Sequence, residues 1–357
     1  MSQRLLAPRS RNPREVVRWL AAVQAQDYAG AKWGLGMRLP GSTDADIERA
    51  FDRGAILRTH LLRPTWHFAA PEDIRWLLAL TAPRVHAANG HMYRRLALDA
   101  TTFRRSAVAL ARALERNNHQ TRDELRAVLE RIGIATDLER MAYLLMHAEL
   151  EGLICSGPRR GKQFTYALLD ERARPTRALA RADALGELTR RFFASRGPAT
   201  PHDFAKWSGL TVKDARAGLE AVADGLERDV VDGTTYWFAP PTRRRAPPRL
   251  PTAHLLSIYD EYISGYRDRS AIISAAHAAR LRKLGNAGIY ILVVNGQVVG
   301  HWARTFTARS VALRIQLYRP LGQAERRAVQ SAAEQFGAFV ERRVELEMRE
   351  ARSKTAR

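Results

Sequence analysis

The chain has 357 residues, 58 Lys and Arg against 37 Asp and Glu, and a single cysteine, so its formal net charge is +21. This length suggests two or three modules, and 46% apolar residues suffice for packed cores, which excludes a wholly disordered chain. Because Cys155 is alone, an intramolecular disulfide and a cysteine-based zinc site are excluded, which fits a reducing compartment. The N-terminus lacks an apolar signal-peptide core and no stretch reaches about 18 apolar residues, so we expect a cytoplasmic, nucleoid-associated protein that does not contact a membrane.

The surplus of positive charge predicts a polyanionic partner, and nucleic acid is the commonest one inside cells. The chain has 52 Arg and only 6 Lys, a skew that a GC-rich genome also produces. That bias explains arginine in place of lysine, but it does not explain the excess of basic over acidic residues. Nucleic acid is therefore the favoured partner, with a solvated basic surface as the alternative.

A first unit is expected over residues 1–100. Three glycines at 30, 34 and 36 weaken its helical pattern. Its order of helix, helix and hairpin is typical of a winged-helix unit. The expected elements are a helix from Pro13 with Asn12 as N-cap, a helix over 44–53, strands at 57–62 and 65–68 joined at Arg63-Pro64, and a further helix opened by Pro71.

The same plan is expected twice more, over residues 101–175 and 176–240. Each unit has three helices followed by a two-stranded hairpin, without useful sequence identity between the copies. The second hairpin has a basic tip at 157–162, and the third turns at Asp232-Gly233. The helices are expected at 106–117, 121–133 and 137–152 in the second unit, and at 184–197, 199–210 and 211–225 in the third.

A basic, proline-rich linker over 241–251 is expected to lead into a β-rich unit over 252–345. That unit contains an Asn295-Gly296 hairpin turn and a last helix from Gln323, and residues 346–357 are expected to be a solvated charged tail. The predicted fold class is therefore α+β: three tandem winged-helix units followed by a C-terminal β-rich unit.

Three segments together resemble a known family. VQAQD at 23–27 with the following KWGLGMRL, LRTHLLRPTWHFAAPEDIRWLLALTAPR from residue 57, and DEYISGYRDRS from residue 260 resemble the AlkZ-like winged-helix DNA glycosylases in order and content. The family's signature is Gln-apolar-Gln, whereas its YcaQ branch carries Gln-apolar-Asp. The resemblance implies that Gln24 and Gln26 are catalytic. It also implies monofunctional excision of bulky or crosslinked N7-alkylated purines from duplex DNA, leaving an abasic site.

The motif makes a structural demand and suggests a chemistry. On a continuous helix Gln24 and Gln26 would point about 200° apart, so a shared role requires the helix to end or distort near Ala25. An N7-alkylated purine is already cationic and leaves without protonation. What remains is to hold a water and to stabilise positive charge near C1′, which amide carbonyls can share. Lys32 is the only nearby lysine, and hence the only candidate there for a Schiff-base nucleophile.

Basic residues of two hairpins are the predicted DNA contacts, and polar residues near the two outer motifs are the predicted lining of the cleft. Trp66 could instead be core, Asp27 could be a helix-end residue, and Asp260 could form a structural Asp–Arg pair between modules. The predicted DNA contacts are Arg58, His60, Arg63, His67, Arg159, Arg160 and Lys162, and the predicted lining residues are Asp27, Trp66, Asp260, Tyr266 and Arg267.

The sequence contains no motif for metal-dependent, nucleotide-dependent or serine-hydrolase chemistry. HExxH, phosphate-binding loops and GxSxG are absent, and His86 and His91, five residues apart, do not form a convincing ligand pair, so no metal or cofactor is predicted. A winged-helix transcription regulator or non-catalytic DNA-binding protein is the alternative function, although no effector domain or dimerising coiled coil is visible. Tandem modules could clasp duplex DNA as a monomer without an obligate protein partner.

Overall fold

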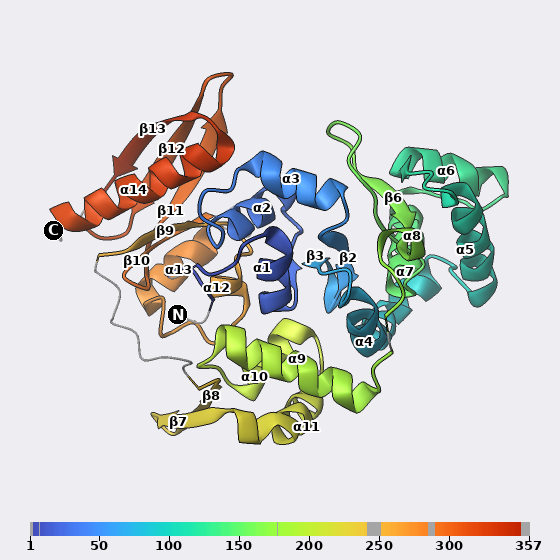
Figure 1. Ribbon diagram of the computed structural model, residues 1–357, viewed down its shortest axis with the longest axis horizontal. Helices are drawn as coiled ribbons and strands as arrows, with labels where there is room; N and C mark the ends of the chain where they lie inside the picture. Colours follow the sequence, from blue (N-terminus) through green and yellow to red (C-terminus); the bar gives the residue numbers. More distant parts are fainter. Residues whose placement is uncertain (1–2, 7, 177, 241–250, 285–289, 351–357) are drawn as a thin grey trace.

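The structure is a computed structural model that describes all of the chain except residues 1–2, 7, 177, 241–250, 285–289 and 351–357. Figure 1 shows a first group of helices and strands at the centre, a second group to the right, a third below, and a C-terminal sheet at the upper left. This mixture of helices and sheets confirms the α+β class. The predicted linker lies outside the described residues, apart from position 251.

The first group holds the Gln-Ala-Gln motif. Helix α1 begins as predicted, because the Asn12 side chain accepts a hydrogen bond from the Glu15 N–H. It ends at Leu20, since Ala21 has a φ of 61°, which a right-handed helix cannot continue. The elements are α1 (Pro13–Leu20), β1 (Val23–Gln24), α2 (Tyr28–Gly36), α3 (Asp44–Asp52), β2 (Leu57–Leu61) and β3 (Arg63–Ala69), with the strands in the antiparallel order β1-β3-β2.

The glycines that weaken the helical pattern lie inside α2, where they allow close packing. A Cβ at Gly36 would stand 2.5 Å from the Phe339 ring of the C-terminal unit. Glycine at this position therefore lets α2 approach helix α14 (Gln323–Val340), which contains Phe339 and lies far along the chain.

The second group follows the long helix α4 (Ile74–Arg95), which connects it to the first group. This helix starts three residues later than predicted, because residues 71–73 form a turn. The group has a hydrophobic core of its own, formed by side chains between residues 98 and 166. Its elements are α5 (Ala100–Leu114), β4 (Gln120–Thr121), α6 (Arg122–Arg131), α7 (Leu138–Leu150), β5 (Ile154–Ser156), β6 (Thr165–Leu168) and α8 (Leu169–Arg172), with the sheet order β4-β6-β5.

The third group has the predicted hairpin turn. Asp232 and Gly233 have φ of 47° and 73°, as a two-residue turn between antiparallel strands requires. Its elements are α9 (Arg181–Arg196), α10 (Pro201–Ser208), α11 (Val212–Val222), the 3₁₀ turn η1 (Ala223–Gly225), β7 (Glu227–Val231) and β8 (Thr234–Phe238).

The C-terminal unit is a five-stranded sheet in the order β13-β12-β11-β10-β9. The turn at Asn295-Gly296 is confirmed, with φ of 50° and 81°. Its elements are β9 (Ala253–Leu256), α12 (Glu261–Ser264), α13 (Ala275–Lys283), β10 (Tyr290–Val294), β11 (Gln297–Phe306), β12 (Ser310–Leu317), α14 (Gln323–Val340) and β13 (Arg343–Arg349).

The start of the predicted charged tail at 346 is wrong, because β13 continues to Arg349 as a parallel edge strand beside β12. In RVELEMR, the apolar side chains of Val344, Leu346 and Met348 alternate with charged ones and pack against the core. Because the segment is highly charged, the alternation of apolar and charged residues that is typical of a strand was not recognised in the sequence.

Two hydrophobic cores meet at the segment before the motif. Val23 and Ala25 belong to a core shared with the C-terminal sheet and α14, whereas Ala21 and Ala22 belong to a core shared with α4 and the third group. The motif therefore lies at the junction of three parts of the molecule. Among the residues described, each helix is too short or too polar to cross a lipid bilayer.

Candidate active site

The motif lies beyond the end of helix α1, so the demand that the helix end before it is met: β1 ends at Gln24 and Gln26 lies in a bend. Helix α1 ends at Leu20, five residues before Ala25, and Gln24 pairs with His67 of β3. The Ala25 N–H donates to the Trp66 carbonyl over 2.7 Å. Gln26 is exposed beyond β1, and its Oε1 accepts from the Trp66 N–H at 3.3 Å. Both glutamines are thus attached to β3, the central strand of this sheet.

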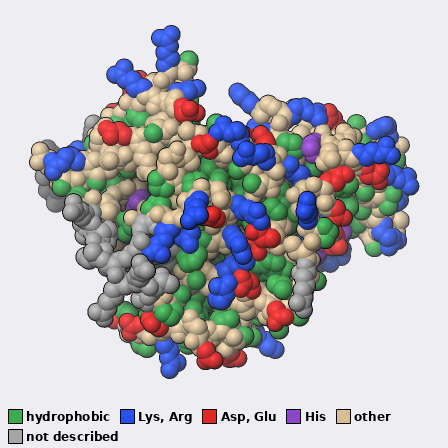
Figure 2. Space-filling model, in the orientation of Figure 1, with side chains coloured by type: hydrophobic (Ala, Val, Ile, Leu, Met, Phe, Trp, Pro, Cys, Tyr) green, Lys and Arg blue, Asp and Glu red, His purple; other side chains and the backbone are tan. Residues whose placement is uncertain are grey.

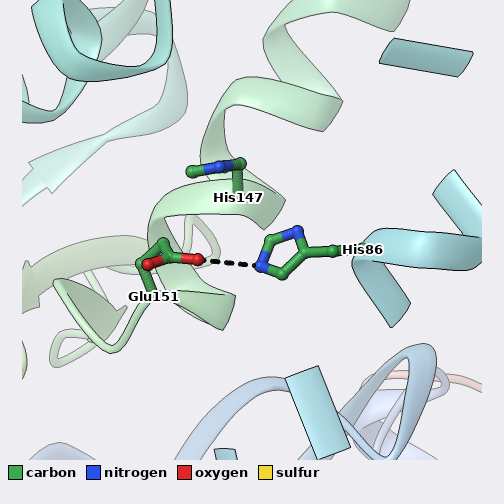
Figure 3. A group of neighbouring side chains, drawn as sticks. All are labelled: His86, His147 and Glu151. Carbon is green, nitrogen blue, oxygen red and sulfur yellow. Dashed lines mark ion pairs between the residues drawn. The ribbon is translucent and has the colours of Figure 1, made fainter. Parts of the chain in front are cut away.

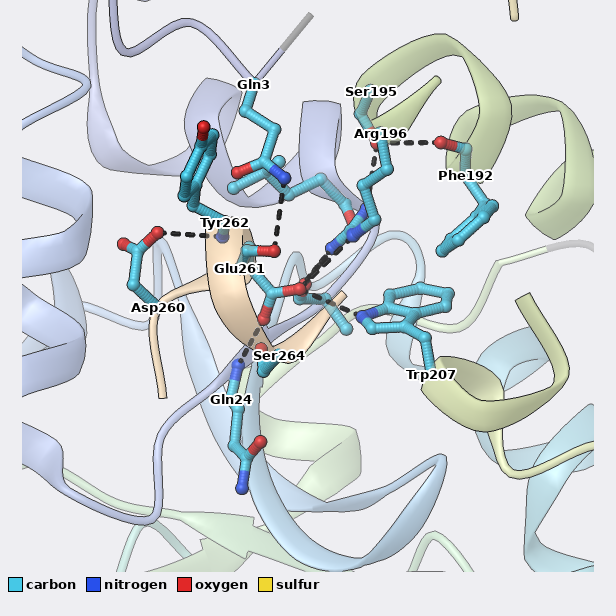
Figure 4. Close-up of polar contacts among 12 residues, drawn as sticks. Gln3, Gln24, Phe192, Ser195, Arg196, Trp207, Asp260, Glu261, Tyr262 and Ser264 are labelled. Atoms are coloured by element: carbon cyan, nitrogen blue, oxygen red, sulfur yellow. Dashed lines mark hydrogen bonds and ion pairs between the residues drawn. The ribbon is translucent and has the colours of Figure 1, made fainter. Parts of the chain in front are cut away.

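Gln24 is held at both ends. Its backbone N–H donates to Glu261 Oε1 at 3.0 Å, and its side-chain Oε1 accepts from Arg63 Nη2 at 3.2 Å. In Figure 4 the amide end of Gln24 points away from Glu261. The residue is only 9% exposed, yet it lines a cavity beside the motif. The side chain is therefore presented to the cavity from a fixed backbone.

The anchor of Gln24 is a buried ion pair that joins the C-terminal unit to the third group (Figure 4). Glu261 Oε2 accepts from Arg196 Nη2 at 2.6 Å and from Trp207 Nε1 at 2.9 Å. Burial raises the pKa of Glu261, but Arg196 and the Gln24 N–H more than offset this, so the net shift is downward. Arg196 also donates to the carbonyls of Leu20 and Ala22, which fixes the bend that leads into the motif.

Glu261, Arg196 and Trp207 are site residues that the sequence did not reveal. Glu261 directly follows Asp260. The resemblance of the DEY segment to the family therefore led to a prediction for the neighbouring residue, Asp260, instead of Glu261. Arg196 and Trp207 lie in unremarkable helical contexts, and only the fold brings them to Glu261. Their contribution is to position Gln24.

A cavity of about 940 Å³ opens beside Gln24. Its charged lining is strongly basic, and Asp268 is the one carboxylate among the lining residues in the described part of the chain. Lys206 donates to the Ser264 carbonyl at 2.6 Å, and burial, followed by the nearby Arg269 and Arg63, lowers its pKa to about 8. The basic lining residues are Arg63, Lys206, Arg267, Arg269 and Arg282. Figure 2 shows basic side chains gathered over the middle of the viewed face.

Comparison with known proteins identifies the family. The profile of a family described as DNA glycosylase AlkZ-like matches residues 17–339. The chain belongs to this AlkZ-like family. It is therefore an enzyme of the DNA N-glycosylase class, and the predicted resemblance is confirmed.

The AlkZ-like chain has similar relatives in Streptomyces sahachiroi. It is 23% identical over 324 residues to an interstrand DNA cross-link repair glycosylase of that organism, an alignment that covers 85% of each chain. Its fold matches the solved structure of the S. sahachiroi DNA glycosylase AlkZ with a TM-score of 0.81 at 20% identity, over 98% of this chain and 97% of the other.

Within this AlkZ-like fold, two cations predicted to touch DNA from the first hairpin are buried. Arg58 is 8% exposed, lies over the Trp66 and Phe164 rings, and its Nε donates to the Ala25 carbonyl at 3.1 Å. Burial lowers the pKa of Arg58 to about 10. His60 is bonded to the buried Glu149. Both side chains are buried and committed to partners inside the protein, so the structure does not present either of them on the surface of the hairpin.

The remaining residues of this hairpin differ in accessibility. His67 is fully buried, and burial and Arg63 lower its pKa to about 3, so it is a neutral ring rather than a cation. Trp66 is half-buried between Arg58 and the His60 ring, whose centroid is 4.4 Å away. Arg63 lines the cavity and donates to the Gln24 side chain, whereas Arg58 reaches only the backbone of the motif.

The tip of the second hairpin holds three predicted DNA contacts in different states. Arg159 packs over the Phe164 ring and lies 3.7 Å from Glu48, while Arg160 is paired with Glu124 at 2.6 Å. Lys162 is exposed, and its ammonium has no ion pair among the described residues. Of the three, Lys162 is thus the side chain with an uncommitted charge.

Of the residues predicted to line the cleft, some lie at the cavity and others have structural contacts elsewhere. Arg267 lines the cavity, but Asp260 is buried and forms a bidentate pair with Arg38, at 2.8 and 2.9 Å. This is the structural Asp–Arg pair between modules that was the alternative for Asp260. Tyr266 donates to the Arg196 carbonyl at 2.7 Å, which places it behind the site.

Asp27 and Lys32 are both committed to structure. Asp27 precedes α2 and accepts from the Tyr290 hydroxyl at 2.6 Å, so it ties the motif segment to the C-terminal sheet. Lys32 is held by Asp44 at 2.7 Å and Glu48 at 2.5 Å, with its side chain 7% exposed. A doubly paired, buried ammonium is a poor nucleophile, which argues against the Schiff-base role considered for Lys32.

Proposed function

We propose that this enzyme hydrolyses the N-glycosidic bond of N7-alkylated purines in duplex DNA, including bulky and crosslinked adducts, and leaves an abasic site. The observation that carries the proposal is Gln24: Glu261 fixes its backbone N–H, Arg63 donates to its side-chain carbonyl, and the residue borders a basic cavity. The S. sahachiroi relative is a cross-link repair glycosylase, which supports the crosslinked substrate.

The proposed chemistry uses the lone pairs of the Gln24 carbonyl. One accepts from Arg63, and the second is available for a water molecule, since an amide oxygen accepts two hydrogen bonds. Gln26 supplies a second side-chain amide, which is held by the Trp66 N–H of β3, next to the residue that pairs with Gln24. Because an alkylated purine leaves as a neutral base, these amides have only to direct the water to C1′ and to stabilise the oxocarbenium-like charge that develops there.

The cavity suits the proposed substrate. An opening of about 940 Å³ lined by five basic side chains can hold DNA phosphates near the motif without enclosing the base in a tight pocket. We infer that the three groups of helices with hairpins act as tandem winged helices that clasp one duplex around this cavity, and that the enzyme acts as a monomer.

A lesion assay tests the catalytic assignment. A duplex with one 7-methylguanine is incubated with enzyme, treated with alkali and resolved on a denaturing gel under single-turnover conditions. We expect Gln24→Ala to slow excision by roughly 10²–10³-fold, the usual effect of removing one preorganised electrostatic group. Gln26→Ala should slow it less, since Gln26 is exposed, and Gln330→Ala on α14 serves as the matched control.

The outcomes separate the substrate from the residues. Excision that persists unchanged in the Gln24→Ala/Gln26→Ala double variant would refute their catalytic role. A second duplex with a nitrogen-mustard interstrand crosslink tests whether the enzyme releases one strand from the crosslink. Activity on 7-methylguanine but not on the crosslink would restrict the proposal to adducts attached to one strand.

Borohydride trapping tests the monofunctional part of the proposal. A lysine nucleophile would form an imine with the sugar that borohydride reduces to a stable protein–DNA adduct. We expect no adduct. An adduct that disappears in Lys206→Ala would show instead that the cavity lysine acts on the sugar.

A further inference from the structure

A cluster of potential metal ligands lies outside the Gln24 cavity, between α4 and α7 (Figure 3). His86 comes from α4, His147 from the last turn of α7, and Glu151 follows that helix directly. One ligand atom from each lies within 4.8 Å of the others. None of the three lines the Gln24 cavity, so this cluster is separate from the proposed catalytic site.

His86 is oriented as a metal-bound histidine usually is. Its Nδ1 is hydrogen-bonded to the Tyr93 hydroxyl at 2.9 Å, which fixes the ring, and its Nε2 lies 3.0 Å from Glu151 Oε1. That Nε2 is buried and has no aligned hydrogen-bond partner among the described residues, although the carboxylate is near. A second bond that fixes the ring while the other nitrogen stays available is the usual arrangement around metal ligands.

His147 completes the set from the neighbouring helix. Its ring is stacked on Phe103 at 3.7 Å with an interplanar angle of 13°, and no hydrogen bond occupies its nitrogens within the described part of the chain. The His86 and His147 ring centroids are 4.9 Å apart. His147 and Glu151, which directly follows α7, are four residues apart, and both lie beside His86 of α4.

We propose that His86, His147 and Glu151 bind one divalent transition-metal ion, best satisfied by Zn²⁺, with solvent as the fourth ligand. Two imidazoles and one carboxylate are a donor set that zinc uses, and the cluster is accessible because Glu151 is exposed. The bound ion would tie α4, which leaves the first group, to α7 of the second. It would thereby fix the position of the second group relative to α4.

The experiment uses the full chain without an affinity tag, stripped with EDTA and dialysed. Calorimetric titration with ZnCl₂ should show one site, and Co²⁺ should give the visible absorption of a tetrahedral complex. Glu151→Gln is the main variant because that side chain is exposed, so we expect the fold to remain intact. We expect it, and His147→Ala, to weaken Zn²⁺ binding by at least about tenfold. His91→Ala, an exposed histidine on the same α4, should bind as the wild type does.

Thermal unfolding provides a second reading. Zn²⁺ at saturating concentration should raise the Tm of the wild type and of His91→Ala by a few degrees, because a ligand that binds the folded state stabilises it. The rise should be absent in Glu151→Gln. Two results would overturn the proposal: no Zn²⁺ binding in the micromolar range, or binding that survives both Glu151→Gln and His147→Ala.

Discussion

The first and second hairpins are both basic in sequence, yet their cations are used in opposite ways. In the first, Arg63 reaches the cavity and donates to Gln24, while Arg58 is buried beneath the motif. In the second, Arg160 is neutralised by Glu124 on the surface. What distinguishes the two hairpins is therefore the partner of each guanidinium.

This difference matters for the net charge of +21. A cation that already has a carboxylate partner contributes little to DNA binding, because the phosphate must displace that partner. The cavity beside Gln24, by contrast, has five basic side chains and one carboxylate among its described lining residues. We therefore expect the cavity to supply more of the DNA affinity than the second hairpin does.

The largest expected effect comes from the anchor of the motif. Glu261→Gln would leave Arg196 as an unpaired charge in the interior, and breaking such a pair costs about 3–5 kcal/mol. We expect the Tm to fall by roughly 4–7 °C in a calorimetric scan. Glu345→Gln, an exposed position on β13, is the control and should leave the Tm within about a degree. An unchanged Tm in Glu261→Gln would contradict the structural role of the pair.

This anchor also shows what the sequence can and cannot predict. Short-range signals worked: the Asn12 cap and the Asn295-Gly296 turn depend on neighbouring residues only. The motif itself was found through its resemblance to a family. Arg196 and Glu261, however, are 65 residues apart and meet only after the third group and the C-terminal unit have packed together.

Burial explains the remaining differences. Arg58 and His60 look like surface cations in sequence, but aromatic rings and Glu149 cover them. Composition cannot reveal such partners, because they come from other elements. Strand β13 was missed for a related reason, since a highly charged segment can still bury every second side chain.

Matched arginines of the two hairpins test the comparison directly. Arg63→Ala removes a charge-assisted hydrogen bond from Gln24, which is worth about 1.5–3 kcal/mol, so we expect excision of 7-methylguanine to slow by roughly 10- to 100-fold. Arg160→Ala removes a surface ion pair and should change the rate by less than about threefold. Equal losses in the two variants would show that the hairpins contribute alike.

The pH dependence of DNA binding probes the cavity. Lys206 has a pKa lowered to about 8, so it carries its charge below that pH and loses it as the pH rises through 8. Affinity for undamaged duplex, measured by fluorescence anisotropy, should therefore weaken by roughly three- to fivefold between about pH 7 and 9, beyond any general trend. Lys206→Arg, which stays charged, should remove this extra loss. An identical profile in the variant would exclude Lys206 as the titrating contact.

The smallest effect is expected at the tip of the second hairpin. Lys162 has no ion pair among the described residues, so it can meet a phosphate without displacing a carboxylate, unlike Arg160. One phosphate contact accounts for about 0.9 in the slope of log affinity against log salt. We expect Lys162→Ala to reduce that slope by up to this amount and to weaken binding by roughly twofold, with Arg160→Ala closer to the wild type. If Arg160→Ala lowers the slope as much as Lys162→Ala does, an existing ion pair with Glu124 does not keep an arginine from DNA.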